Sequence, residues 1–116
     1  MAVTKDFLFE PNERSIARLG KALMHPGRVR IVHALLQNEV LSYSEIVNMI
    51  PLSDSVVDDH LRMLERHELL TRENMANNLA GYALHRGNYR NYLKAMGSYL
   101  HPETRVRALE GVREVG

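Results

Sequence analysis

A helix predicted over Asp54–His67 carries side chains of the kinds that contact base edges in DNA. Its apolar residues Val57, Leu61 and Leu64 recur at spacings of four and three, which assigns them to one inward face. At about 100° of rotation per residue, the polar residues turn outward. With the serine just before the helix, this outward set is Ser53, Ser55, Asp58, Asp59, Arg62 and Arg66. Such hydroxyl, carboxylate and guanidinium groups can hydrogen-bond to bases in the major groove.

The charge of this segment opposes DNA binding. Residues 54–68 contain five acidic and two basic side chains, whereas DNA affinity comes largely from cations that displace counterions at phosphates. A carboxylate can still accept a hydrogen bond from cytosine N4. We expect Asp54 to complement the helix dipole and Asp58 to pair with Arg62, four residues later. Neither role removes the electrostatic cost.

Basic residues are more frequent in the second part of the chain. Residues 1–68 hold eight basic and ten acidic side chains, and residues 69–116 hold seven and four. We expect Arg72, Arg86 and Arg90 to contact phosphates beside the groove, with Arg28 and Arg30 adding to them, although a solvated surface role stays open for each. The loop from Asn74 to Ala80 has no cation and is a poor candidate for minor-groove contact.

Other classes of chemistry find little support in the sequence. The 116 residues include no cysteine, which excludes disulfides, thiolate metal sites and thiol nucleophiles. None of the six histidines has another histidine three or four residues away, so no metal site is expected. There is no phosphate loop, nucleophile elbow or paired-carboxylate motif, so we expect neither an enzyme nor a cofactor. There is also no membrane-length apolar run or signal peptide, and we expect a cytoplasmic protein.

The length suits a single domain built mainly from helices. Asn12 is the predicted cap of a helix over Glu13–Leu23, and a second helix is expected over Pro26–Gln37. Its apolar stripe is predicted as Val29, Val32 and Leu36, widened by Leu35. Ser42 and Glu45 form a capping box for a third helix that ends near Pro51. The brief connection at Pro51 predicts a helix-turn-helix.

A hairpin and a further helix complete the expected fold. Leu69–Arg72 and Gly81–His85 are predicted strands joined by a polar loop, Asn88–Leu100 is a predicted helix, and Pro102 opens a last short helical stretch. We therefore expect an arm over residues 1–11, a winged helix-turn-helix domain over 12–100 and a tail over 101–116.

Three segments resemble the ArsR-type transcriptional repressors. These are residues 21–31 (KALMHPGRVRI), residues 52–61 (LSDSVVDDHL) followed by Leu64 and Leu69, and residues 81–84 (GYAL). The likeness extends over about residues 16–97. It implies a homodimer that binds inverted repeats in double-stranded DNA, with a recognition helix in each major groove. It also implies release by an inducer, often a metal. The sequence departs from the family at Asp54, Asp58 and Asp59, where small polar, amide or basic residues are usual, and it lacks the cysteines of the thiolate sensors.

The predicted first and last helices carry more apolar surface than a small domain readily covers. We expect this surface to form a dimer interface, with completion of a monomer core as the alternative. Its residues are Ile16, Leu19, Tyr89, Tyr92, Leu93, Met96, Tyr99 and Leu100.

The sequence thus predicts a sequence-specific DNA-binding transcriptional regulator of ArsR type, a repressor that senses neither thiol reagents nor metals, with an unusually acidic recognition helix and an unidentified inducer. The alternative is a winged-helix module for protein–protein contact whose DNA binding is weak or lost.

Overall fold

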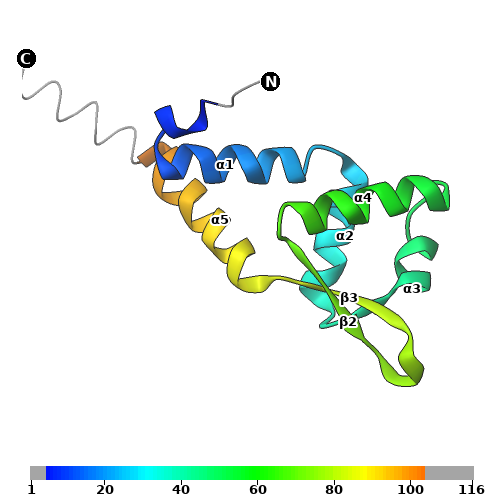
Figure 1. The fold of residues 1–116 in the computed structure, drawn as a ribbon. Helices are drawn as coiled ribbons and strands as arrows, with labels where there is room; N and C mark the ends of the chain where they lie inside the picture. The colour runs from blue at the N-terminus through cyan, green and yellow to red at the C-terminus, as the bar shows by residue number, and fades with distance from the viewer. Residues whose placement is uncertain (1–4, 104–116) are drawn as a thin grey trace, which may run out of the picture.

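A computed structural model describes residues 5–103 and consists of five helices with a small antiparallel sheet (Figure 1). The helices are α1 (Pro11–Ala22), α2 (Pro26–Gln37), α3 (Tyr43–Asn48), α4 (Asp54–Arg66) and α5 (Arg86–Leu100). The strands are β1 (Leu41–Ser42), β2 (Leu70–Asn74) and β3 (Ala80–Leu84), and short 3-10 turns span Asp6–Leu8 and Ala76–Asn78. This arrangement confirms the predicted winged helix-turn-helix fold. The expected helical stretch after Pro102 lies almost wholly outside the described residues.

The sheet has the strand order β1-β3-β2, and β1 was not predicted. A strand of two residues is too short to show alternation. It is recognised only through its pairing with β3, which places Leu41 opposite Tyr82 and Ser42 opposite Gly81. A Cβ at Gly81 would lie 3.0 Å from Val40 and closer still to Met75, so glycine allows the approach. The β2–β3 hairpin projects away from the packed pair α1 and α5 (Figure 1).

Several predicted boundaries shift because side chains cap the helices differently. The N-cap of α1 is Glu10 instead of Asn12; its N–H donates to the Glu13 carboxylate at 2.8 Å, and Pro11 occupies the first turn, where no amide donor is needed. Helix α5 begins two residues earlier than predicted, with the His85 Nδ1 atom accepting from the Asn88 N–H at 3.0 Å. Strand β2 extends to Asn74, two residues beyond its predicted end, and β3 begins at Ala80, one residue before its predicted start.

The core confirms the predicted inward face of α4, whereas that of α2 is confirmed only at Val32 and Leu35. Val57, Leu61 and Leu64 are buried, whereas Val29 is 48% and Leu36 39% exposed. The buried residues of α2 are Gly27, Arg28, Ile31, Val32 and Leu35. Arg28 occupies one of these inward positions although it is charged. Hydropathy therefore assigned the inward stripe to Val29 and Leu36, one residue beyond the buried Arg28 and Leu35.

Arg28 joins three helices from inside the protein, which corrects its expected role near phosphates. The side chain is 8% exposed. Its Nε atom donates to His60 Nδ1 at 3.1 Å, and its Nη1 atom donates to the carbonyls of Lys21 and Ala22 at 3.2 and 3.5 Å. The guanidinium therefore connects the end of α1 to the start of α2 and to the middle of α4.

His60 is held in its neutral form by this arrangement. Burial lowers the pKa of His60, with further lowering by His25 and Arg28, while Asp59 opposes the shift. The His25 ring lies 4.3 Å from the His60 ring, centroid to centroid. Burial likewise lowers the pKa of His67, beside Lys21, Arg18, Arg28 and Arg66.

No helix among residues 5–103 combines the length and the apolar character needed to span a bilayer.

Replacing Arg28 with Met should lower the free energy of unfolding by about 2–4 kcal/mol, because buried acceptors lose their donor. Arg30→Met on the same helix removes one exposed hydrogen bond, to the Met49 carbonyl at 3.2 Å, and should cost less than about 1 kcal/mol. Urea denaturation measures both. Equal losses in the two variants would contradict a special role for Arg28.

Stability should fall on mild acidification. Because the folded-state pKa values of His60 and His67 lie below that of an unfolded histidine, about 6.5, the unfolded chain binds more protons in this range. The loss therefore begins as the pH falls through about 6.5 and is complete below the folded-state values. Thermal denaturation between about pH 7.5 and 5.5 measures it. His60→Asn retains an acceptor for Arg28 and should flatten the profile; an unchanged slope would exclude His60 as a contributor.

Candidate nucleic-acid interface

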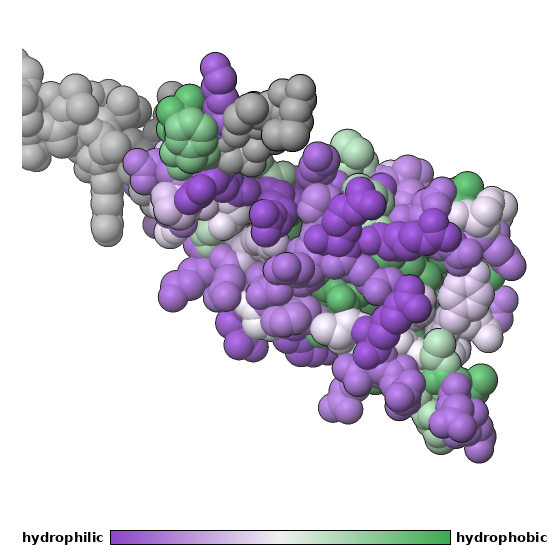
Figure 2. Space-filling view, in the orientation of Figure 1, coloured by the Kyte–Doolittle hydropathy of each residue, from purple (hydrophilic) through white to green (hydrophobic). Residues whose placement is uncertain are grey.

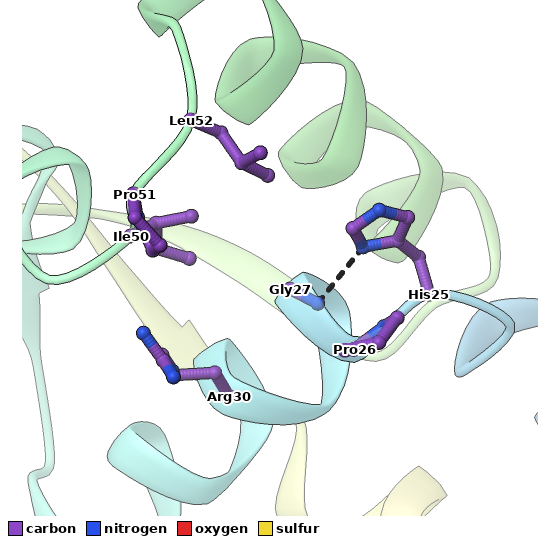
Figure 3. Close-up of a pocket in the computed structure, with 7 residues that line it drawn as sticks. All are labelled: His25, Pro26, Gly27, Arg30, Ile50, Pro51 and Leu52. Carbon is purple, nitrogen blue, oxygen red and sulfur yellow. Dashed lines mark hydrogen bonds between the residues drawn. The ribbon is translucent and has the colours of Figure 1, made fainter.

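A tight corner sets the direction in which α4 leaves α3. The predicted capping box is present at the start of α3: the Ser42 hydroxyl accepts from the Glu45 N–H at 3.1 Å, and the Glu45 carboxylate accepts from the Ser42 N–H at 3.0 Å. Ile50 is buried at the corner. Arg30 approaches from α2 and, with Ile50, Pro51 and Leu52, borders a shallow pocket of about 140 Å³ (Figure 3).

The start of α2 closes the other side of this pocket. The His25 ring accepts the Gly27 N–H at Nδ1, 2.9 Å away, and so caps the helix (Figure 3). A Cβ at Gly27 would lie 3.1 Å from that nitrogen and 3.4 Å from the His60 ring. The helix-turn-helix is therefore closely packed against the N-terminal end of α2.

The outward edge of α4 brings together four of the predicted contact residues. Ser53 and Ser55 lie at its start, Asp59 and Arg62 lie near its middle, and all four are exposed. The hydroxyl oxygens of Ser53 and Ser55 lie 3.3 Å apart, and the Ser53 hydroxyl makes no capping hydrogen bond although Ser53 is the N-cap residue. Arg62 and Asp59 form a 3.8 Å ion pair in which both side chains are about 70% exposed.

Asp58 has a different partner from the one predicted. Its carboxylate accepts a 2.6 Å hydrogen bond from the Tyr43 hydroxyl on α3 instead of pairing with Arg62. This bond raises the pKa of Tyr43 to about 12, with smaller contributions from burial and from the charges of Asp58 and Asp54. The expectation of an Asp58–Arg62 pair was wrong because it considered partners on one helix only. Tyr43 was not singled out in the sequence, where its place inside the capping box was the sole signal.

The cation of the hairpin, Arg72, is bound to a carboxylate of α4. The Arg72 Nε and Nη2 atoms donate to both carboxylate oxygens of Glu65, at 3.0 and 3.2 Å. The Arg72 Cζ atom lies 5.9 Å from the centre of the Tyr82 ring. The hydrogen bonds to Glu65 are the main reason why the pKa of Arg72 is raised. Arg72 thereby compensates the negative charge of Glu65 on α4. The pairing also means that Arg72, which was predicted to contact phosphate, already has a carboxylate partner.

The remaining predicted cations are spread over other surfaces. The Arg86 Nη2 atom donates to the carbonyls of Leu35 and Leu36 at 2.9 and 3.3 Å, and so caps the end of α2. Arg90 lies one turn further along α5 and is exposed. Arg66 lies at the far end of α4, in a cleft shared with α1.

The tip of the hairpin combines apolar side chains with two asparagines and has no basic residue. Residues 75–80 contain no cation, and the Leu79 side chain is 56% exposed. Figure 2 shows hydrophobic side chains gathered at this tip, while most of the surface in view is hydrophilic.

The residues predicted for a dimer interface divide into three groups by exposure. Leu19 and Tyr92 are buried within one chain, and the Tyr92 hydroxyl donates to the His67 carbonyl at 3.1 Å. Ile16, Tyr89 and Met96 are half-buried. Leu93, Tyr99 and Leu100 stay exposed, as do the arm residues Phe7, Leu8 and Phe9. The Tyr99 hydroxyl also donates to Glu13 at 2.6 Å and so connects α5 to α1.

Comparisons with known proteins agree with this architecture. The family model described as bacterial regulatory protein, arsR family, matches residues 25–72. No curated protein matches the chain. Among solved structures, an ArsR-like transcriptional regulator from Rhodococcus sp. RHA1 shares 16% identity with a TM-score of 0.73, over 92% of this chain and 97% of that one.

Two further structures are more similar in sequence. HlyU from Vibrio cholerae N16961 is 26% identical with a TM-score of 0.61, over 80% of this chain and 100% of that one. The cadmium metal-sensor CMTR from Mycobacterium tuberculosis is 30% identical with a TM-score of 0.52, over 75% of this chain and 84% of that one.

Proposed function

Because the chain belongs to the ArsR family of bacterial regulatory proteins, whose members are DNA-binding transcriptional regulators and not enzymes, we propose that it binds an inverted repeat in double-stranded DNA and represses transcription there. The observation that carries the proposal is the exposed N-terminal half of α4, which follows a tight turn on a winged scaffold. In this geometry a helix can enter the major groove with its first turns toward the bases.

The proposed base contacts come from residues that the fold leaves outward. Ser55 and Arg62 supply donors, and a guanidinium is well suited to guanine. The Asp59 carboxylate accepts a hydrogen bond from cytosine N4 where a cytosine faces it. At other bases its negative charge repels the DNA phosphates. Arg90 is an exposed candidate for phosphate contact. Arg72 and Arg86 are exposed too, but they can add to it only by sharing donors with Glu65 and with α2. We infer modest, strongly salt-dependent affinity.

The proposed regulator does not use thiolates. No cysteine is present in the chain, so a cadmium site built from sulfur ligands cannot form. We propose that it senses something other than metals or thiol reagents.

A second candidate function is protein–protein contact through the same winged helix. Two observations favour it: the exposed Leu79 at a hairpin tip without cations, and the engagement of Arg72 by Glu65. Both features weaken the hairpin as a DNA contact and suit an apolar partner.

DNA binding should respond to charge on the outward edge of α4. At about 50 mM salt, Asp59→Asn should strengthen binding to a random-sequence duplex by roughly two- to tenfold, because it removes repulsion near several phosphates. Arg62→Gln should weaken binding to a selected duplex by about tenfold, because it removes the guanidinium proposed to contact guanine. Lys94→Gln, an exposed cation on α5, serves as the control and should change affinity by less than about twofold. Fluorescence anisotropy measures each, and selection from random duplexes identifies the site.

Two results would reject the proposal in favour of the interaction module. One is the absence of binding at low salt by a correctly folded protein. The other is equal binding by wild type and Arg62→Gln to every selected sequence.

A dimer should form through α1 and the exposed apolar residues of α5. Leu93 and Leu100 are 44% and 57% exposed, so glutamate at both positions should leave the fold intact while opposing association. Sedimentation should show a dimer for wild type and a monomer for Leu93→Glu/Leu100→Glu. Leu79→Glu, equally exposed but on the hairpin, should stay dimeric. A monomeric wild type at tens of micromolar would contradict the prediction.

A further inference from the structure

A second concave surface lies away from the outward edge of α4. The cleft is formed by the arm, one side of α1, the C-terminal end of α4 and α5, and it encloses about 1000 Å³. Small-molecule sites in proteins commonly occupy about 300–1000 Å³. Arg66 at this cleft is 11 residues beyond Ser55, or about 17 Å along the helix axis. The cleft is therefore distinct from the surface proposed to contact bases.

The cleft is lined by four cations. Arg14, Arg18 and Lys21 follow one another at spacings of four and three residues, so they share one side of α1, and Arg66 approaches from α4. Among the described side chains, the ion pairs are Arg62–Asp59 and Arg72–Glu65, and neither involves these four. Their charges are available to a ligand.

The two carboxylates of the cleft do not balance these cations. Glu13 already accepts hydrogen bonds from the Tyr99 hydroxyl at 2.6 Å and from the Glu10 N–H at 2.8 Å. These two bonds lower the pKa of Glu13. Glu68 is the other acidic residue of the lining. The cleft thus has an excess of positive charge, which favours an anion.

A buried nitrogen at the same place lacks a partner. His67 lines the cleft, and its Nε2 atom is buried without a hydrogen bond from the described residues. Burial lowers the pKa of His67 first, followed by Lys21, Arg18, Arg28 and Arg66. A nearby anion would stabilise the imidazolium and oppose this lowering of the pKa.

Aromatic side chains provide the apolar part of the lining. Phe9 from the arm and Tyr92 from α5 border the cleft, and Phe9 is exposed. A phosphate ion would leave these rings unused. We propose that this cleft binds a small organic anion, a carboxylate with an aromatic body, whose charge contacts the α1 cations and whose ring packs against Phe9 and Tyr92.

The site gives the protein a means of regulation. A ligand that contacts Arg66 and α1 together acts on the same rigid helix whose other end we propose contacts bases. This consequence rests on the proposed function, whereas the binding itself does not, so the two are tested separately.

Calorimetry on the full chain, without DNA, tests binding with 2-naphthoate as the probe. The expected result is saturable binding that weakens at least about tenfold for the neutral analogue 2-naphthalenemethanol and in Arg14→Gln/Arg18→Gln, because charge-assisted bonds are lost. Phe9→Ala should weaken it by several-fold. Lys94→Gln, an exposed cation outside the cleft, should change it by less than about twofold. By NMR, 2-naphthoate should raise the pKa of His67.

Four outcomes would overturn the proposal. Equal affinity for 2-naphthalenemethanol would indicate a plain apolar patch, and equal competition by inorganic phosphate would indicate a simple anion site. A loss in Lys94→Gln as large as in the double variant would indicate general electrostatic attraction. Binding by Leu93→Glu/Leu100→Glu but not by wild type would show that a second copy of the chain fills the cleft.

The regulatory consequence has its own measurement. Saturating 2-naphthoate should change the anisotropy-derived affinity for a selected duplex at least about threefold in wild type and not in Arg14→Gln/Arg18→Gln. If naphthoate binds and DNA binds but neither affects the other, the coupling is rejected.

Discussion

The buried guanidinium of Arg28 is the contact on which the arrangement of the helices depends. A charge in the interior is tolerated only when its donors are satisfied, and here they are used by His60 and by carbonyls at the end of α1. The same bonds hold the end of α1 and the middle of α4 against α2. Because His60 must accept a hydrogen bond, it must be neutral at Nδ1, and so the position of α4 depends on the protonation of one buried ring.

The fold also gives the carboxylates of α4 different partners. The sequence shows a helix with an excess of carboxylates, but these carboxylates differ in their surroundings. Asp58 accepts from Tyr43, and Glu65 is held at two points by Arg72. Asp54 and Asp59 are left exposed at the N-terminal half, where a helix dipole favours negative charge. The field that a nucleic acid would meet is therefore set by two or three side chains, not by the total for the segment.

The two ends of α4 have different environments, and this separation gives the molecule two surfaces. The N-terminal half is exposed beside the helix-turn-helix corner, with a serine pair and an ion pair along its edge. The C-terminal end lies in a cleft with α1, where cations outnumber carboxylates. The two surfaces thus lie at opposite ends of one helix of 13 residues.

The sequence by itself determined the features that arise from local interactions. The start of α2 at Pro26, the Ser42 capping box, the corner at Pro51 and the inward face of α4 follow from neighbours within one turn, and together they define the winged helix. Only the tertiary structure decided the partners of the charged and polar side chains. Arg28 and His60 are 32 residues apart, Tyr43 and Asp58 are 15 apart, and Arg86 and Leu35 are 51 apart. Rules of helical spacing cannot find such pairs, because the pairs come together only when the chain packs.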